Sequence, residues 1–169
     1  MYQEYLKGSK RIGRGAFTTA YRKGNVVYAV SRDSAKECIS LFCGGTHIPK
    51  VERLEYDEKS LYKMPLYRKV NKQQFPKAWQ DYQTIRKFFI KYYNAPYKSF
   101  NYKEFTELTE NLSEDKTIRK PLKESIIQLI ESMFNYTDRV GFEISPRNIA
   151  VDSRKRLVLL DVIYNPSDL

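Results

Sequence analysis

The residues with the clearest chemical capacity lie near the C-terminus, in the run Gly-Phe-Glu-Ile-Ser-Pro-Arg-Asn. Glu143 is followed five residues later by Asn148, and after a short basic turn an apolar strand is expected to end on Asp161. A carboxylate can accept the proton of an attacking hydroxyl group, and an amide and a second carboxylate are oxygen ligands suited to Mg²⁺. The three residues are candidates for metal-assisted phosphoryl transfer, with Glu143 as the base and Asn148 and Asp161 as metal ligands. The alternative role for Glu143 is a structural hydrogen-bond acceptor.

Two glycines near the N-terminus would complement such a site. Gly13 and Gly15 are expected at a turn between strands, where the missing Cβ lets backbone N–H groups approach phosphate oxygens. A dinucleotide-binding fold would open a helix after the glycines, but a hairpin across Lys-Gly-Asn is predicted here instead. A Gly-x-Gly sequence also occurs in ordinary turns, so its interpretation depends on the rest of the chain.

Hydrophobic periodicity predicts strands first, then helices, then a hairpin. Strands are expected within residues 11–32, 51–56 and 60–66, helices over 34–42, 75–93, 103–111 and 122–134, and the closing hairpin over 149–151 and 157–160. Ser34 is the expected N-cap of the first helix, and residues 94–102 are expected to be a loop. The predicted fold class is α+β: one domain unit with a strand-rich small lobe (1–66) and a helical lobe (67–169) that carries the catalytic-type loop and the terminal hairpin.

Composition narrows the class of protein. The 169 residues are 41% hydrophobic and 14% aromatic, which is too apolar for a disordered chain. We expect a cytoplasmic protein without a membrane span, because no apolar run reaches about 18 residues and no secretory core is present. A net charge of +10 attracts polyanions, which include nucleotide phosphates, nucleic acid and acidic proteins.

The order of these motifs resembles the protein kinase family over nearly the whole chain. Gly13-Arg14-Gly15-Ala16-Phe17 resembles its Gly-rich loop, residues 28–31 with Ala29 resemble its third strand, and residues 47–51 resemble the segment before its fourth strand. Residues 143–148 resemble the catalytic loop, and Asp161 resembles the metal-binding acid. The resemblance implies a compact bilobed fold with a truncated C-terminal lobe, similar to small kinase-like proteins of tailed phages. It implies ATP and Mg²⁺ as ligands, with Gly13, Arg14, Gly15 and Ala29 at the nucleotide.

The chain departs from the family pattern at the phosphate-gripping cation. The third-strand lysine of the family is Ser31 here, and Glu37, which would orient that lysine, is expected to lack its usual partner. Arg14, Arg22 and Lys23 are the candidate replacements. Strand alternation places Arg22 on the face of Ala20, so Arg22 reaches the cleft if Ala20 covers the base.

Other departures bear on catalysis. The family's third glycine is Thr18, its catalytic aspartate is Glu143, and the lysine of its catalytic loop is Ser145. Val162-Ile163 follows Asp161 in place of the family's Phe-Gly, and the sequence stops at Leu169 without an activation segment.

Three functions remain open. The first is a minimal Ser/Thr kinase that modifies host proteins, acting in the host cytoplasm if the chain is phage-encoded. The second is a catalytically impaired pseudokinase that binds and inhibits a partner protein. The third is a basic nucleic-acid-binding domain that uses the N-terminal cations together with Tyr2, Tyr5 and Tyr21 for stacking.

Overall fold

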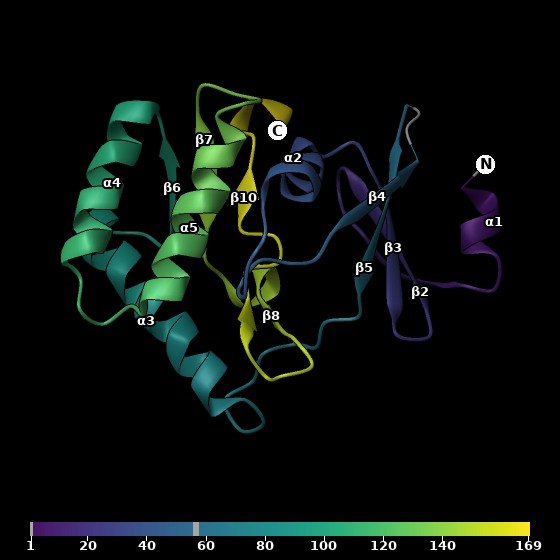
Figure 1. Ribbon diagram of the computed structural model, residues 1–169, viewed down its shortest axis with the longest axis horizontal. Helices are drawn as coiled ribbons and strands as arrows, with labels where there is room; N and C mark the ends of the chain where they lie inside the picture. Colours follow the sequence, from purple (N-terminus) through teal and green to yellow (C-terminus); the bar gives the residue numbers. More distant parts are fainter. Residues whose placement is uncertain (1, 56–57) are drawn as a thin grey trace.

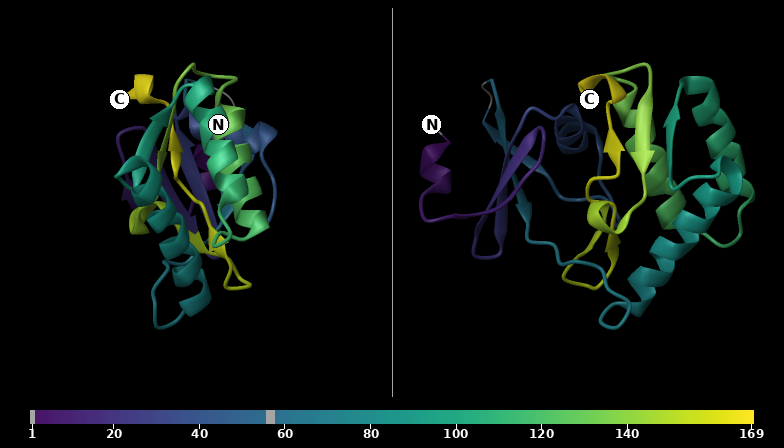
Figure 2. Two further views of the ribbon diagram at one scale, coloured as in Figure 1. Left: turned by 90° about the vertical axis from the view of Figure 1, so that its left-hand side faces the viewer. Right: turned by 180° about the vertical axis from the view of Figure 1, so that it is seen from behind.

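The computed structural model describes residues 2–55 and 58–169, and it has the predicted α+β class. A five-stranded sheet lies at the end of the molecule that holds the N-terminus, and three long helices lie at the other end (Figure 1). The view from behind shows the same separation, with the C-terminal segment between the two parts (Figure 2). Within the described ranges no helix is long and apolar enough to cross a membrane.

The five-stranded sheet is antiparallel throughout, in the order β1-β2-β3-β5-β4. A short helix α1 (Gln3–Leu6) precedes it, and its strands are β1 (Lys10–Arg14), β2 (Thr18–Lys23), β3 (Val26–Ser31), β4 (Glu52–Glu55) and β5 (Ser60–Pro65). Gly24 occupies the turn between β2 and β3 with a φ of +61°. A residue with a Cβ adopts this left-handed backbone conformation only with strain. The predicted connection between β4 and β5 includes Tyr56 and Asp57, which lie outside the described residues.

Helix α2 (Ser34–Phe42) follows the sheet's central strand and joins the two parts of the molecule. Its buried face, which includes Cys38 and Ile39, packs into the same hydrophobic core as α5. The predicted N-cap was wrong by one residue: Asp33 is the N-cap, and its Oδ1 accepts a hydrogen bond of 2.9 Å from the amide of Ala35. A carboxylate there satisfies a first-turn N–H group and also opposes the helix dipole.

The helical part contains α3 (Pro76–Tyr93), α4 (Tyr102–Glu114) and α5 (Lys120–Met133). Each buries one apolar stripe, as the three- and four-residue spacing of its large side chains predicts. Helix α4 begins with a capping box in which Asn101 and Glu104 each accept the other's backbone N–H.

A small sheet that the sequence did not predict supports the C-terminal segment. Its order is β10-β7-β6, formed by Ile163–Tyr164, Val140–Glu143 and Tyr97–Phe100. Part of the segment expected to be a loop is therefore a strand. Phe142 of β7 stacks on Phe89 of α3, with 4.8 Å between ring centroids, and this contact fixes β7 against the helices. The predicted closing hairpin is present as β8 (Ala150–Val151) and β9 (Leu157–Val158), and a 3₁₀ turn (Pro146–Asn148) precedes it.

Candidate functional site

Backbone hydrogen bonds bring the three C-terminal candidates into one region. The amide of Glu143, at the end of β7, donates to the carbonyl of Val162 at 2.8 Å. The amide of Asp161 donates to the carbonyl of Asn148 at 2.9 Å. The loop from Glu143 to Asn148 is thus hydrogen-bonded at both ends to the segment that contains Asp161. These contacts depend on backbone pairing and not on side-chain chemistry.

A cleft of about 480 Å³ lies between the five-stranded sheet and this C-terminal segment. It joins the predicted glycine turn to the predicted metal-binding acid. Its described lining consists of Ile12, Gly13, Arg14, Gly15, Thr18, Ala20, Val27, Ala29, Lys36, Ile39, Val51, Met64, Pro65, Leu66, Tyr67, Arg147, Leu160 and Asp161. Of the proposed nucleotide-binding residues, Gly13, Arg14, Gly15 and Ala29 therefore share one cavity with Asp161.

The glycine turn roofs one end of the cleft. The amide of Gly15 donates a 2.8 Å hydrogen bond to the carbonyl of Thr18, which closes the turn between β1 and β2. A Cβ built at Gly13 would meet no atom within 4 Å, and one at Gly15 would meet only the Thr18 oxygen, at 3.8 Å. The fold itself therefore has room for side chains at both positions, and packing does not require glycine at either.

Lys36 of α2 lines the cleft together with Arg14 and Arg147, and the sequence interpretation did not single it out. Its Nζ lies 3.3 Å from Asp161 Oδ1 and 3.4 Å from Asp33 Oδ2. Burial by itself would lower the pKa of Lys36, but the two carboxylates, Asp161 foremost, outweigh burial and raise the pKa above its usual range. Lys36 is therefore charged throughout the neutral range. In the sequence, the only signal for this role of Lys36 was its i,i+3 spacing from Asp33 at the start of a predicted helix.

Ser31, which the sequence resemblance aligns with the third-strand lysine of protein kinases, is enclosed by neighbouring residues. Its Oγ lies 2.6 Å from Thr18 Oγ1 on the adjacent strand and accepts a 3.0 Å hydrogen bond from the amide of Asp33. The residue is buried. The hydroxyl groups of Ser31 and Thr18 thus satisfy each other, and Lys36 of the next helix contributes a cation to the cleft.

Glu37 has a partner after all. Its carboxylate forms an ion pair with Arg53 on β4, not with a third-strand lysine. Neighbouring residues of a helix point about 100° apart, so Lys36 faces the cleft while Glu37 faces the sheet.

Glu143 and Asn148 lie beside the cleft and not in its described lining. Glu143 Oε1 accepts a 3.1 Å hydrogen bond from Arg147, which does line the cleft. The Asn148 side-chain nitrogen lies 3.4 Å from the carbonyl oxygen of Glu143, an orientation that leaves Asn148 Oδ1 available. The acid and the amide are therefore held at the cleft's edge.

Arg22 does not line the cleft among the described residues. Its Nε donates a 2.9 Å hydrogen bond to the carbonyl of Gly24, so its guanidinium turns toward the β2–β3 turn. Ala20, two residues earlier on the same face, does line the cavity.

Mg²⁺ would find few protein ligands here. No group of three or more His, Cys, Asp or Glu side chains suited to a metal occurs in residues 2–55 and 58–169. Mg²⁺ usually keeps several waters and takes one or two carboxylates together with substrate phosphates. Asp161, whose side chain is 55% exposed, and the oxygen of Asn148 fit that smaller requirement.

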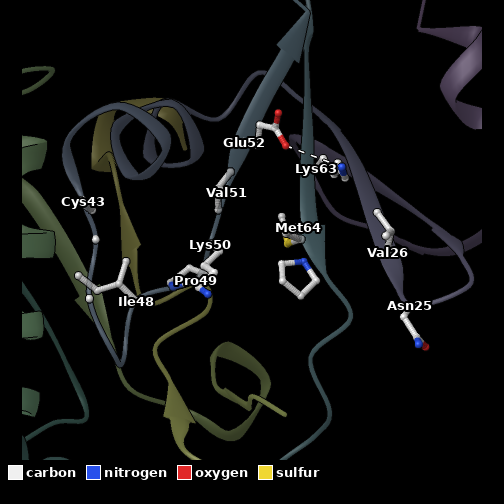
Figure 3. A pocket seen from close by; sticks show the side chains of 13 residues that line it. Asn25, Val26, Cys43, Ile48, Pro49, Lys50, Val51, Glu52, Lys63 and Met64 are labelled. Atoms are coloured by element: carbon white, nitrogen blue, oxygen red, sulfur yellow. Dashed lines mark ion pairs between the residues drawn. The ribbon is translucent and has the colours of Figure 1, made fainter. Parts of the chain in front are cut away.

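A second hollow, of about 600 Å³, lies at the same end of β5 as the cleft and also contacts β4 and residues 43–50 (Figure 3). It shares Val51, Met64 and Pro65 with the cleft, and its only ion pair drawn is the exposed one between Lys63 and Glu52. Neither the glycine turn nor Asp161 reaches this hollow, so we assign the candidate chemistry to the smaller cleft.

No protein-family profile matches the chain, and no curated protein matches it significantly. The functional interpretation therefore depends on the geometry of the cleft and on the order of the motifs.

Proposed function

We propose that this chain is a kinase-like protein, compact and bilobed, that binds ATP with Mg²⁺ in the cleft between the sheet and the C-terminal segment. One observation carries the proposal: the glycine turn, a partly buried lysine and an acid line a single cavity although they come from distant parts of the sequence. Anionic phosphates are commonly bound by close approach to a glycine-containing backbone turn, a fixed cation and a metal-binding oxygen. A cytoplasmic location, in the host if the gene belongs to a phage, forms part of the same proposal.

The apolar lining suits a nucleotide base. Ala20 and Ala29 from the sheet and Leu160 from the C-terminal segment line the same cavity. A flat base between such surfaces would bury apolar area, while the glycine turn and Lys36 would face the phosphates. Mg²⁺ held by Asp161 and Asn148 would neutralise part of the phosphate charge. Lys36 is the cation that replaces the missing third-strand lysine in this proposal.

Phosphoryl transfer to a protein hydroxyl is the second step of the proposal. The partly exposed carboxylate of Glu143 lies at the edge of the cleft, where it would accept the proton of an attacking serine or threonine hydroxyl. Arg147 holds this carboxylate in place and also lines the cleft. If Glu143 takes no proton, the same cleft describes a pseudokinase that acts by binding a partner protein.

Thermal unfolding with ATP, with and without Mg²⁺, tests the binding proposal. At a ligand concentration about a hundredfold above Kd, binding adds ~2.7 kcal/mol to the free energy of unfolding. For a domain of this size that corresponds to a rise in Tm of roughly 5–10 °C. The rise should need Mg²⁺, disappear in Asp161→Asn and persist in Asp138→Asn, which removes an exposed carboxylate away from the cleft. Equal shifts in both variants, or no shift, would refute the proposal.

A further inference from the structure

A further cavity, distinct from both the proposed nucleotide cleft and the hollow beside β5, lies where α3 and α5 begin. Its volume is about 460 Å³. Its described lining is Thr46, His47, Gln74, Phe75, Pro76, Lys77, Ala78, Asp81, Arg119, Pro121, Arg154, Lys155 and Arg156. Five of these residues are cationic and one is acidic, so the cavity is strongly electropositive.

The acids near the cavity already have partners. Asp81 receives two hydrogen bonds from Arg119, at 2.6 and 3.2 Å. Asp152, in the β8–β9 turn, accepts from Arg156 at 2.8 Å and caps the amides of Arg154 and Arg156. In the described part of the chain no carboxylate pairs with Lys77, Arg154 or Lys155, which leaves three cations for a ligand.

Two long helices direct their positive ends at the same place. Helix α3 has 18 residues and α5 has 14, and both lack a side-chain N-cap hydrogen bond and an acid in the first turn. Arg119, the N-cap residue of α5, bonds to Asp81 of α3 and holds the two helix starts together. Figure 1 shows both helices rising from the lower part of the molecule, beside the β8 hairpin. First-turn N–H groups and helix dipoles favour an anion there.

His47 gives an independent indication of a ligand. The residue is 1% exposed and lines the cavity, and its Nδ1 lies 2.7 Å from the carbonyl oxygen of Leu157. Because a carbonyl only accepts, Nδ1 carries the proton and Nε2 presents a lone pair. Among the residues that the structure describes, Nε2 has no hydrogen-bond partner. A ligand that shares a proton with Nε2 would give this acceptor a partner.

We propose that this cavity binds a phosphate monoester, as a phosphorylated side chain or as a small phosphate compound. The unpaired cations and helix ends would hold the anionic oxygens, and the proton shared with His47 Nε2 separates a monoester from a phosphodiester. A monoester titrates with a pKa near 6 and can carry that proton, whereas a diester has none to offer. The proposal is independent of the nucleotide cleft.

Calorimetric titration of the full chain, without nucleotide and at low salt, tests this. The probes are inorganic phosphate, a phosphoserine peptide, the unphosphorylated peptide and oligodeoxythymidine. The phosphoserine peptide should bind and its unphosphorylated form should not, and stronger binding of the peptide than of inorganic phosphate identifies a phosphorylated side chain as the source. Arg154→Ala and Lys77→Ala should each weaken binding about tenfold, as expected for a lost charge-assisted hydrogen bond. Lys87→Ala removes an exposed lysine of the same helix and should have no effect, as should Lys36→Met in the nucleotide cleft.

The pH dependence isolates His47. Burial lowers the pKa of His47, and the positive charges of Arg119 and Arg156 lower it further. The hydrogen bond to Leu157 and the charge of Asp81 oppose this shift but do not cancel it, so the ring of the free protein is neutral at pH 7. Above pH 7 the bound complex would hold one proton more than its separated partners, so affinity should fall up to tenfold per pH unit. His47→Asn can keep the bond to Leu157 through its side-chain N–H but lacks the second nitrogen, so it should bind with a flat pH profile. Equal loss in Lys87→Ala, a flat profile in the wild-type protein, or oligodeoxythymidine binding as tightly as the phosphopeptide would overturn the proposal.

Discussion

The amide of Asp161 donates its hydrogen bond to the carbonyl of Asn148, so the backbone holds together the two residues proposed to bind Mg²⁺. The side chains of Asp161 and Asn148 take no part in this hydrogen bond. Asp161 directs its carboxylate to Lys36, and the Asn148 side-chain nitrogen points back to the Glu143 carbonyl. The proposed metal ligands are therefore positioned before any ligand arrives, and substitution of either side chain should alter binding without dismantling the loop.

Replacement of Lys36 tests which cation grips the phosphates. Lys36→Met should weaken Mg·ATP binding about 10- to 100-fold, because a charge-assisted hydrogen bond to the phosphates is lost. Lys36→Arg keeps the charge and should retain part of the affinity. Calorimetry measures both, and Lys23→Met is the matched control, since Lys23 is exposed and outside the described lining of the cleft. A larger effect at Lys23 than at Lys36 would contradict the assignment.

Substitution in the glycine turn separates folding from ligand approach. A Cβ at Gly15 meets only the Thr18 oxygen at ordinary contact distance, so Gly15→Ala should change the free energy of unfolding by less than about 1 kcal/mol. The same methyl group would intrude where backbone N–H groups approach phosphate, so ATP affinity should fall several-fold. Chemical denaturation and ATP titration of the same sample give both numbers. Unchanged ATP affinity would mean that phosphate does not lie under this turn.

Glu143 decides between enzyme and pseudokinase. If the protein transfers phosphate, Glu143→Gln should abolish most transfer and spare nucleotide binding, because the amide fills the same space but accepts no proton. Glu143→Asp restores the family's shorter acid and should be tolerated or faster. Transfer of radiolabel from ATP to the protein itself or to host lysate measures this, with Asp161→Ala as the background. No label above that background, with Mg²⁺ or Mn²⁺, would refute phosphoryl transfer and leave the two functions that depend on binding alone.

Gly141 of β7 is required by packing. It pairs with Tyr164 across the small sheet, and a Cβ at this glycine would overlap the Tyr164 ring. Gly141→Ala should lower the free energy of unfolding by about 1–3 kcal/mol, the usual cost of overpacking. The ring is partly exposed and can shift, so the lower end of this range is expected. In a Tyr164→Ala background the cost of Gly141→Ala should vanish, and an undiminished cost there would assign it to the backbone.

The sequence predicted the turn at Gly15 and the long helices, because each depends on local spacing. Gly13 lies within β1 and not in the turn, and the strand expected to end on Asp161 ends at Val158. The sequence did not predict Lys36, since many N-terminal cations have similar surroundings in sequence and only the packing of α2 against α5 turns this one toward the cleft. The strands β6, β7 and β10 were missed because two to four residues carry too little periodicity. The N-cap is Asp33 and not the predicted Ser34 because both residue types cap helices well, so the sequence alone did not distinguish them.

Helix α2 has a consequence for how the molecule opens. It carries the cleft lysine on one side, the Glu37 ion pair to β4 on a second and core residues packed with α5 on a third. A helix anchored on three sides cannot swing out as an independent regulatory lever. Hydrogen exchange should therefore show the amides of α2 and α5 opening together, in one cooperative unit, and a ligand in the cleft should slow exchange in α5 without touching it.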